Sequence, residues 1–103
     1  MVRVADIQYK TKHLNNVCSN FGVAQLHYGC RMAEKIHQRI KEITAIDNVE
    51  MLVQYSIGRC HPLKGDRIGE YAMDLVHPFR LVFKKTGITT MQVVKILCIE
   101  NYH

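Results

Sequence analysis

The chain has 103 residues, of which 48% are hydrophobic and 22% are charged, a balance that is ordinary for a globular domain. This composition excludes intrinsic disorder and collagen-like repeats, and no apolar run is long enough for a membrane-spanning helix. Fourteen Lys and Arg against nine Asp and Glu give a formal net charge of +5, which mildly favours a polyanionic partner such as nucleic acid. We expect one domain over residues 1–103 and no membrane partner.

The cysteines do not have the spacing of a metal or redox site. No C-x-x-C pair occurs, so a zinc ribbon and a redox dithiol are both unsupported. His27 and Cys30 could supply two metal ligands, but no second pair stands near them in the sequence. Free thiols fit a reducing compartment, and residues 1–6 lack the apolar stretch of a signal peptide. We therefore expect a cytoplasmic protein with no metal and no cofactor.

The N-terminal third of the chain predicts a strand followed by a helix. Residues 4–9 alternate between two sets of side chains, which is typical of a short strand with one buried face. Apolar side chains then recur at steps of three and four residues between Leu14 and Phe21. This spacing predicts a short amphipathic helix that Asn20 and Gly22 close.

A second and stronger helical pattern follows. Apolar residues form one stripe from Met32 to Ile43, and charged residues, among them Arg39, cover the remaining faces. This helix is expected to end around residues 47–48 and to form a hairpin with the first. Because such a stripe is normally part of the core, we assign both helices to the scaffold.

The C-terminal half changes to the alternating pattern of strands. Residues 70–76 and 79–84 predict two strands joined by a turn at residues 77–78. After a break at residues 85–87, residues 91–99 predict a third strand. The order of elements predicts an α+β fold, with an N-terminal strand and a helical hairpin packed on one face of a mainly antiparallel twisted sheet. The opposite face of the sheet is expected to be free to hold a site.

Side chains capable of chemistry gather just before and within this sheet. Residues 59–69 contain one histidine, three cations and two glycines, Gly65 and Gly69, and a basic surface turn would also have this composition. Arg80 stands in an otherwise apolar strand, where a charge needs an acidic partner or an open cleft. The sequence closes on Tyr102 and His103 directly after the last predicted strand, so this imidazole could lie beside the same surface.

Histidine, lysine and arginine together can supply what RNA cleavage without a metal requires. The 2′-hydroxyl must be activated, the charge on the phosphorane must be stabilised, and the departing 5′-oxygen must be protonated. Imidazole suits both proton transfers because its pKa lies near neutrality, and guanidinium offers paired donors to phosphoryl oxygens. The sequence contains no Ser-His-Asp signature, P-loop or dinucleotide-binding glycine motif that would point to another chemistry.

Three segments carry a resemblance to a known family: HPLKGDR at 61–67, DLVHPFRLVF at 74–83 and VKILCIENYH at 94–103. Over residues 59–103 the sequence strongly resembles the HigB branch of the RelE/ParE toxin superfamily of type II toxin–antitoxin systems, and residues 5–58 fit its layout with less specific motifs. The resemblance implies a RelE/ParE-like fold with the active surface on a concave sheet. It also implies that mRNA is cut in the ribosomal A site.

The same resemblance implies roles for individual residues. His61 and His103 match the proton-transfer residues, and Arg80 matches the arginine that stabilises the phosphate. Lys64 matches a basic residue beside the scissile phosphate, and Tyr102 matches a residue that stacks on a base or donates a hydrogen bond. We assign RNA contact to four further residues, Arg59, Arg67, Lys84 and Asn101.

The sequence departs from the family pattern in two places. Asn101 stands where the family's terminal motif often carries an acid, and residues 75–77 lack the second arginine that several relatives place before the turn. The partners implied are a helix-turn-helix antitoxin similar to HigA, the ribosome with its mRNA, and operator DNA only through the toxin–antitoxin complex.

Three functions are compatible with this sequence. The first is a ribosome-dependent, metal-independent mRNA endoribonuclease that arrests translation, for which the mild charge predicts little cleavage of naked RNA, since the ribosome positions the substrate. The second is a ParE-like inhibitor of DNA gyrase, against which the grouping of His61, Lys64, Arg80 and His103 argues. The third is a catalytically degenerate homologue that only binds its antitoxin. For Cys60, beside His61, a packing role is more common than a nucleophilic one.

Overall fold

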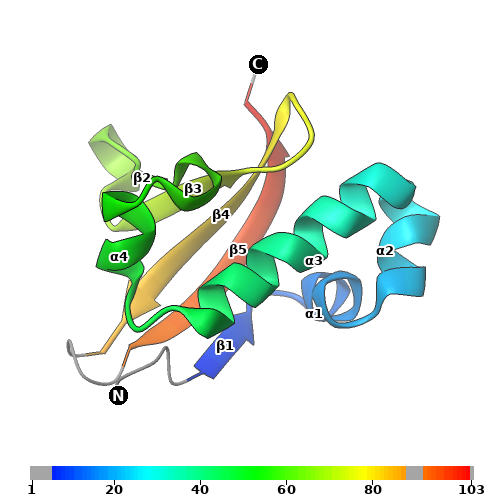
Figure 1. The fold of residues 1–103 in the computed structure, drawn as a ribbon, viewed down its shortest axis with the longest axis horizontal. Helices are drawn as coiled ribbons and strands as arrows, with labels where there is room; N and C mark the ends of the chain where they lie inside the picture. The colour runs from blue at the N-terminus through cyan, green and yellow to red at the C-terminus, as the bar shows by residue number, and fades with distance from the viewer. Residues whose placement is uncertain (1–5, 88–91, 103) are drawn as a thin grey trace.

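The computed structural model describes residues 6–87 and 92–102, and within them five strands form one sheet accompanied by four α-helices. Figure 1 shows α1, α2 and α3 grouped beside β1 and β5, with α4 and the hairpin of β2 and β3 on the other side. The elements are β1 (Asp6–Tyr9), α1 (Lys12–Ser19), α2 (Phe21–Tyr28), α3 (Cys30–Ala45), α4 (Val49–Gln54), β2 (His61–Pro62), β3 (Glu70–Asp74), β4 (Phe79–Thr86) and β5 (Val93–Asn101). Two single turns of 3₁₀ helix, Ile57–Arg59 and Gly65–Arg67, flank β2.

The sheet confirms the predicted α+β class and its mainly antiparallel character. Its strand order is β1-β5-β4-β3-β2, and the pairs β2–β3, β3–β4 and β4–β5 are antiparallel. The pair β1–β5 is parallel, with Asp6 opposite Val93. A parallel pair needs a crossover connection, and here the helices and the other strands lie between β1 and β5 in the sequence.

The helical region differs from the predicted two-helix hairpin. Asn20 ends α1, but it also begins α2, because its side-chain Oδ1 accepts a hydrogen bond of 3.1 Å from the N–H of Val23. Gly22 therefore lies inside α2, and its expected role as the end of a helix was wrong. Apolar side chains are scattered around α2, and α4 is only six residues long, so neither helix has the periodic stripe on which the prediction relied.

Helix α3 contains the predicted stripe, and the side chains between Met32 and Ile43 join the core against the sheet. Arg39 was assigned to the polar surface, but the structure buries it. Its Nε donates a hydrogen bond of 2.7 Å to the carbonyl oxygen of Asp74, and its Nη1 lies 2.8 Å from Oε1 of Glu42. These bonds satisfy a buried guanidinium and tie α3 to the end of β3.

The bounds of the strands differ slightly from the predicted ones. β3 ends at Asp74 rather than at residue 76, because the N–H of Phe79 donates to the carbonyl of Val76 at 2.8 Å and closes the turn. β4 continues to Thr86, since β5 extends the pairing as far as Val93. The predicted positions 4, 5 and 91 lie outside the described residues.

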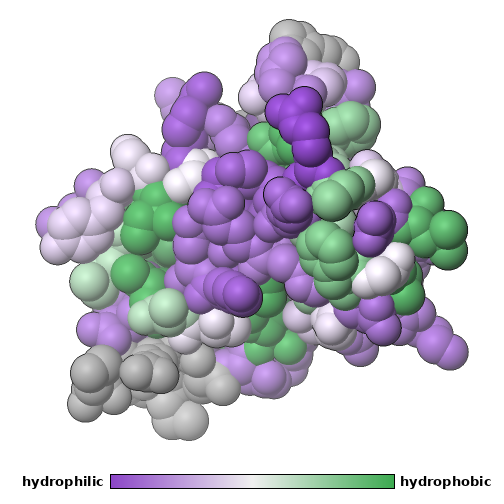
Figure 2. Space-filling view, turned by 45° about the vertical axis from the view of Figure 1, so that its right-hand side comes forward, coloured by the Kyte–Doolittle hydropathy of each residue, from purple (hydrophilic) through white to green (hydrophobic). Residues whose placement is uncertain are grey.

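The surface of the helical side is mostly polar, as expected if the apolar stripe of α3 faces the sheet. Figure 2 shows a broad hydrophilic surface across the middle of the side that bears the helices, with apolar patches at its borders. The exposed side chains of α3 that are polar include Arg31, Glu34, Gln38 and Lys41. Among the helices of residues 6–87 and 92–102, none combines the length and the apolar character needed to cross a bilayer.

Candidate functional site

The register of the strands brings the predicted site residue Arg80 to the same face of the sheet as two carboxylates. On β4, Leu81 packs in the core, so its neighbours Arg80 and Val82 point to the opposite face. Arg80 is paired with Asp74 on β3 and with Glu100 on β5, and directly paired residues project their side chains to the same side. We refer to this surface, which carries Asp74, Arg80 and Glu100, as the site face.

The next row of the site face contains His61. The register pairs His61 with Ala72, Ala72 with Val82, and Val82 with Cys98. The edge strand β2 thus places the imidazole on the site face, two strands and one row away from Arg80. Residues that are separated by 19 positions in the sequence are brought to the same surface by two antiparallel hairpins.

Two arginines converge on the carboxylate of Glu100. Arg67 donates from Nη1 to Oε2 at 2.9 Å and from Nη2 to Oε1 at 3.0 Å. Arg80 donates from Nε to Oε2 at 2.8 Å, and its Nη2 lies 2.7 Å from the same oxygen. The Nε of Arg67 also donates to Glu70 at 3.0 Å. Such charge-assisted, bidentate contacts are among the strongest hydrogen bonds in proteins.

The site face is therefore less open than the sequence predicts. Arg67 belongs to the loop between β2 and β3, and it bonds to Glu70 and Glu100, which lie in the rows on either side of the His61 row. Ala72 and Val82 have no exposed surface even though they point away from the core cluster. The loop and its arginine cover the middle of the face.

Tyr102 completes the surroundings of Arg80. The guanidinium carbon of Arg80 lies 5.0 Å from the centre of the Tyr102 ring, which is a cation–π distance. The main-chain N–H of Tyr102 donates to the carbonyl oxygen of Pro78 at 3.2 Å, and this bond holds the residue beside the start of β4. The ring also meets His77 edge to face, with the ring centres 6.3 Å apart. Two of the predicted site residues, Arg80 and Tyr102, are thus in direct contact.

The hydrogen bonding of His61 fixes its neutral tautomer. Nδ1 of His61 lies 2.8 Å from the carbonyl oxygen of Arg59, and since a carbonyl can only accept, Nδ1 carries the proton. Nε2 of the neutral ring then has its lone pair available to take a proton. The Nε of Arg59 lies 3.3 Å from Oδ2 of Asp74, so the chain segment that orients His61 is anchored on the site face.

The structure places the other predicted residues at different distances from this group. Lys64 is exposed and begins the 3₁₀ turn that carries Arg67. Lys84 points to the site face but stands four residues further along β4 than Arg80, about 13 Å away for an extended strand. Asn101 is paired with Phe79, which packs against the core, so its side chain points to the other face of the sheet. His103 lies outside the described residues.

Glu100 is the site residue that the sequence reasoning missed. The family pattern often has an acid at the position of Asn101, but the alternation of side chains along β5 directs residue 100 to the site face and residue 101 away from it. The unexplained charge of Arg80 in an apolar strand was the available signal, because it required an acidic partner. Locating that partner required the register between β4 and β5.

The electrostatics of the network follow from these contacts. The hydrogen bonds from Arg67, and to a smaller extent those from Arg80, hold the pKa of Glu100 at about 2, well below its ordinary value of 4.5. In contrast, burial raises the pKa of the Cys60 thiol to about 12, so this cysteine is not a thiolate at neutral pH. No cluster of three or more metal-ligating side chains occurs within the described part of the chain.

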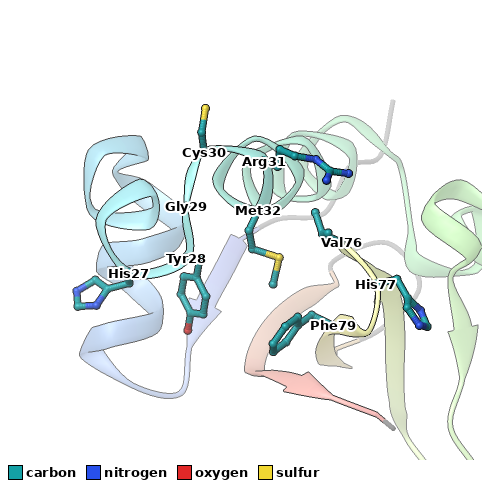
Figure 3. Close-up of a pocket in the computed structure, with 9 residues that line it drawn as sticks. All are labelled: His27, Tyr28, Gly29, Cys30, Arg31, Met32, Val76, His77 and Phe79. Carbon is teal, nitrogen blue, oxygen red and sulfur yellow. The ribbon is translucent and has the colours of Figure 1, made fainter.

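A separate groove of about 570 Å³ lies on the helical side of the molecule, between the start of α3 and the β3–β4 turn. Figure 3 shows the side chains of Met32 and Phe79 approaching one another across it, whereas Cys30 points away. Phe79 lines this groove and the following residue, Arg80, points to the site face. The groove and the ion-pair network therefore lie on opposite sides of β4.

Comparison with known proteins gives a result at the level of the fold. No protein-family model matches the sequence, and no curated protein matches it at a significant level. The structure is similar to a YoeB/ParE toxin from Agrobacterium tumefaciens, with a TM-score of 0.66 and 17% identity over 95% of this chain and 99% of that one. It is also similar to YoeB from Staphylococcus aureus, described as a dimer, with a TM-score of 0.62 and 22% identity over 99% of both chains. The chain therefore has the fold of the YoeB/ParE toxin structures.

Proposed function

We propose that this protein is the toxin of a type II toxin–antitoxin system, and that it acts as a ribosome-dependent, metal-independent endoribonuclease that cuts mRNA in the ribosomal A site. The observation that supports this most directly is the position of His61, in a defined tautomer, on the same face of the sheet as the guanidinium of Arg80. The HigB-like segments and the similarity in fold to toxin structures support the same function.

The proposed reaction uses these groups in sequence. The 2′-oxygen of the RNA attacks the adjacent phosphorus and the bond to the 5′-oxygen breaks, which leaves a 2′,3′-cyclic phosphate and a 5′-hydroxyl. Nε2 of His61 takes the proton of the 2′-hydroxyl, because Nδ1 is already donating to the carbonyl of Arg59. Arg80 and Lys64 stabilise the charge that develops on the phosphorane. His103 is the proposed proton donor to the departing 5′-oxygen.

The charge distribution supports dependence on the ribosome. The guanidiniums of Arg59, Arg67 and Arg80 are each paired with a carboxylate, so these three charges contribute little to the capture of free RNA. Substrate that is already positioned by a ribosome does not require such capture, because its orientation lowers the entropic part of the barrier. We further propose a HigA-like helix-turn-helix antitoxin as the inhibitor, operator DNA as a partner only through that complex, and the cytoplasm as the place of action.

The test is a reconstituted translation reaction to which the purified protein is added, with messenger ends mapped by primer extension. Cuts that appear only when ribosomes translate the message are the expected result. Equal cutting of naked RNA contradicts the ribosome dependence. Intact messenger with normal translation contradicts the nuclease function, and a gyrase supercoiling assay then tests the alternative of a ParE-like inhibitor.

A further inference from the structure

We propose that Glu100 occupies the position of an RNA phosphate in the free protein, and that a phosphate of the RNA backbone displaces it from Arg80 when RNA binds. The inference rests on the proposed function in so far as the ligand is RNA. The inference adds to that function a role for Glu100, which controls the access of RNA to the arginines. It also implies that RNA must break the ion pair between Glu100 and Arg80 when it binds.

The geometry around Glu100 is that of an anion site that is already filled. Two N–H groups of Arg67 and the Nε–Nη2 edge of Arg80 surround a single carboxylate, at distances between 2.7 and 3.0 Å. The guanidinium fork binds carboxylate and phosphate oxygens with the same paired geometry. A phosphate that enters this part of the site face therefore competes with Glu100 for the same donors.

The charges of the network balance in this state. Arg67 and Arg80 contribute two positive charges, and Glu70 and Glu100 contribute two negative charges. A polyanion gains little by approaching a neutral cluster, and it gains a full ion pair once a carboxylate leaves. The side chain of Glu100 is 24% exposed, so its carboxylate can turn toward water without crossing the core.

Arg80, rather than Arg67, is the arginine that is released. Arg67 is also bonded to Glu70, and it keeps this partner if Glu100 moves away. Arg80 has no second carboxylate within ion-pair distance among the described residues, but the ring of Tyr102 lies 5.0 Å from its guanidinium carbon. The ring keeps the guanidinium on the site face without consuming its in-plane donors, so the freed fork is oriented for phosphate.

The test measures the binding of a single-stranded 2′-O-methyl RNA oligomer, which cannot be cleaved, by fluorescence anisotropy at several salt concentrations. For Glu100→Gln we expect affinity to rise by about tenfold at low salt, and the salt dependence to steepen by about one phosphate contact. Glu34→Gln on the exposed surface of α3 is the matched control, because it removes the same charge far from the network. Unchanged or weaker binding by Glu100→Gln, or an equal gain for Glu34→Gln, overturns the proposal.

A second measurement identifies which arginine exchanges its partner. Inorganic phosphate is titrated into the labelled protein while the Nε–H signals of Arg67 and Arg80 are followed by NMR. We expect the signal of Arg80 to shift more than that of Arg67. We also expect this shift to occur at a lower phosphate concentration in Glu100→Gln than in the wild type. A larger shift of Arg67 overturns the assignment. If Glu100→Gln is not folded, Glu100→Asp is used in both measurements, since it keeps the charge but is too short to reach both guanidiniums, and a gain in affinity is again expected.

These readouts separate the displacement from the nuclease function. A gain in RNA affinity without any cleavage on ribosomes overturns the proposed function and keeps the displacement. Cleavage on ribosomes without a gain in affinity for Glu100→Gln keeps the proposed function and overturns the displacement.

Discussion

Arg80 and Glu100 face each other directly across β4 and β5, with Nη2 of the arginine 2.7 Å from Oε2 of the glutamate. The pair explains why a charged residue is tolerated within an apolar strand, because its desolvated guanidinium has a carboxylate partner at the adjacent strand. The same pair connects the fold to the proposed chemistry, since it holds the arginine at the surface that carries His61.

The fork of Arg80 is expected to be needed for activity, and not only its charge. Arg80→Lys keeps the charge but loses the paired donors that hold a planar anion, so we expect cleavage on ribosomes to fall by about 10²–10³-fold. The cleavage activity of Arg80→Ala should fall by at least as much. Cleavage rates are measured by primer extension, with circular dichroism to verify the fold. Arg31→Ala, at the exposed start of α3, serves as a control that should retain activity. Full activity of Arg80→Lys contradicts a role for the fork.

His61 is expected to be essential for growth arrest. Its Nδ1 is held by the carbonyl of Arg59, so replacement by alanine removes the available Nε2 and leaves no other ring in that row of the described sheet. We expect His61→Ala to abolish growth arrest on induction in cells without changing the melting temperature by more than a few degrees. His13→Ala, on the exposed side of α1, should remain toxic. Full toxicity of both His61→Ala and Arg80→Ala shows that the site has been placed wrongly.

Acid should weaken the fold through Glu100. The pKa of Glu100 is about 2 in the folded chain and about 4.5, its ordinary value, in the unfolded chain. Its contribution to stability is therefore fully present above pH 4.5 and is lost as the pH falls toward 2. We expect Glu100→Gln to reduce the free energy of unfolding at pH 7 by roughly 1–2 kcal/mol, after allowance for solvent screening. Urea unfolding, measured at pH 7 and at successively lower pH, should show that the difference in the free energy of unfolding between Glu100→Gln and the wild type becomes smaller. A difference that stays constant contradicts the ion-pair origin.

Substitution of Gly58 is expected to destabilise the fold, because the side chain of Arg39 lies against this glycine. A Cβ at this position would lie 2.7 Å from Nε of Arg39, and the backbone has a φ of +59°, which side chains rarely adopt. We expect Gly58→Ala to lower the free energy of unfolding by about 2–4 kcal/mol, through strain and through displacement of the buried guanidinium. Gly65→Ala is the control, since its φ is +70° but nothing lies within 4 Å of the added carbon. Equal losses in the two variants, measured by urea unfolding, show that the backbone alone is responsible.

Cys60 is expected to have no part in catalysis despite its position beside His61. Burial raises the pKa of its thiol to about 12, so at neutral pH it is protonated and poorly nucleophilic. We expect Cys60→Ala to keep its cleavage activity on ribosomes while losing about 1 kcal/mol of stability through the missing sulfur atom. Loss of cleavage in a variant that is folded, as judged by circular dichroism, contradicts this assignment.

Local patterns in the sequence were sufficient for the class of fold and for most of the elements. The stripe from Met32 to Ile43 predicted the main helix, and the alternation after residue 70 predicted β3, β4 and β5 to within a few residues at each end. These signals are local because a helix and a half-buried strand each repeat their burial at a fixed short period. Helix α2 lacks such a period and depends on Asn20 for its start, so it was not predicted.

What the sequence determined by itself is therefore the set of elements and the supply of chemical groups, including His61 and an unexplained Arg80. What only the tertiary structure decided is which groups meet. Arg67 and Glu100 stand 33 residues apart and come together because β3, β4 and β5 pair in one particular register. A shift of that register by one residue would turn every side chain to the opposite face. The periodicity of a single strand does not record the register, because the register depends on the turns and on which faces of neighbouring strands are buried together.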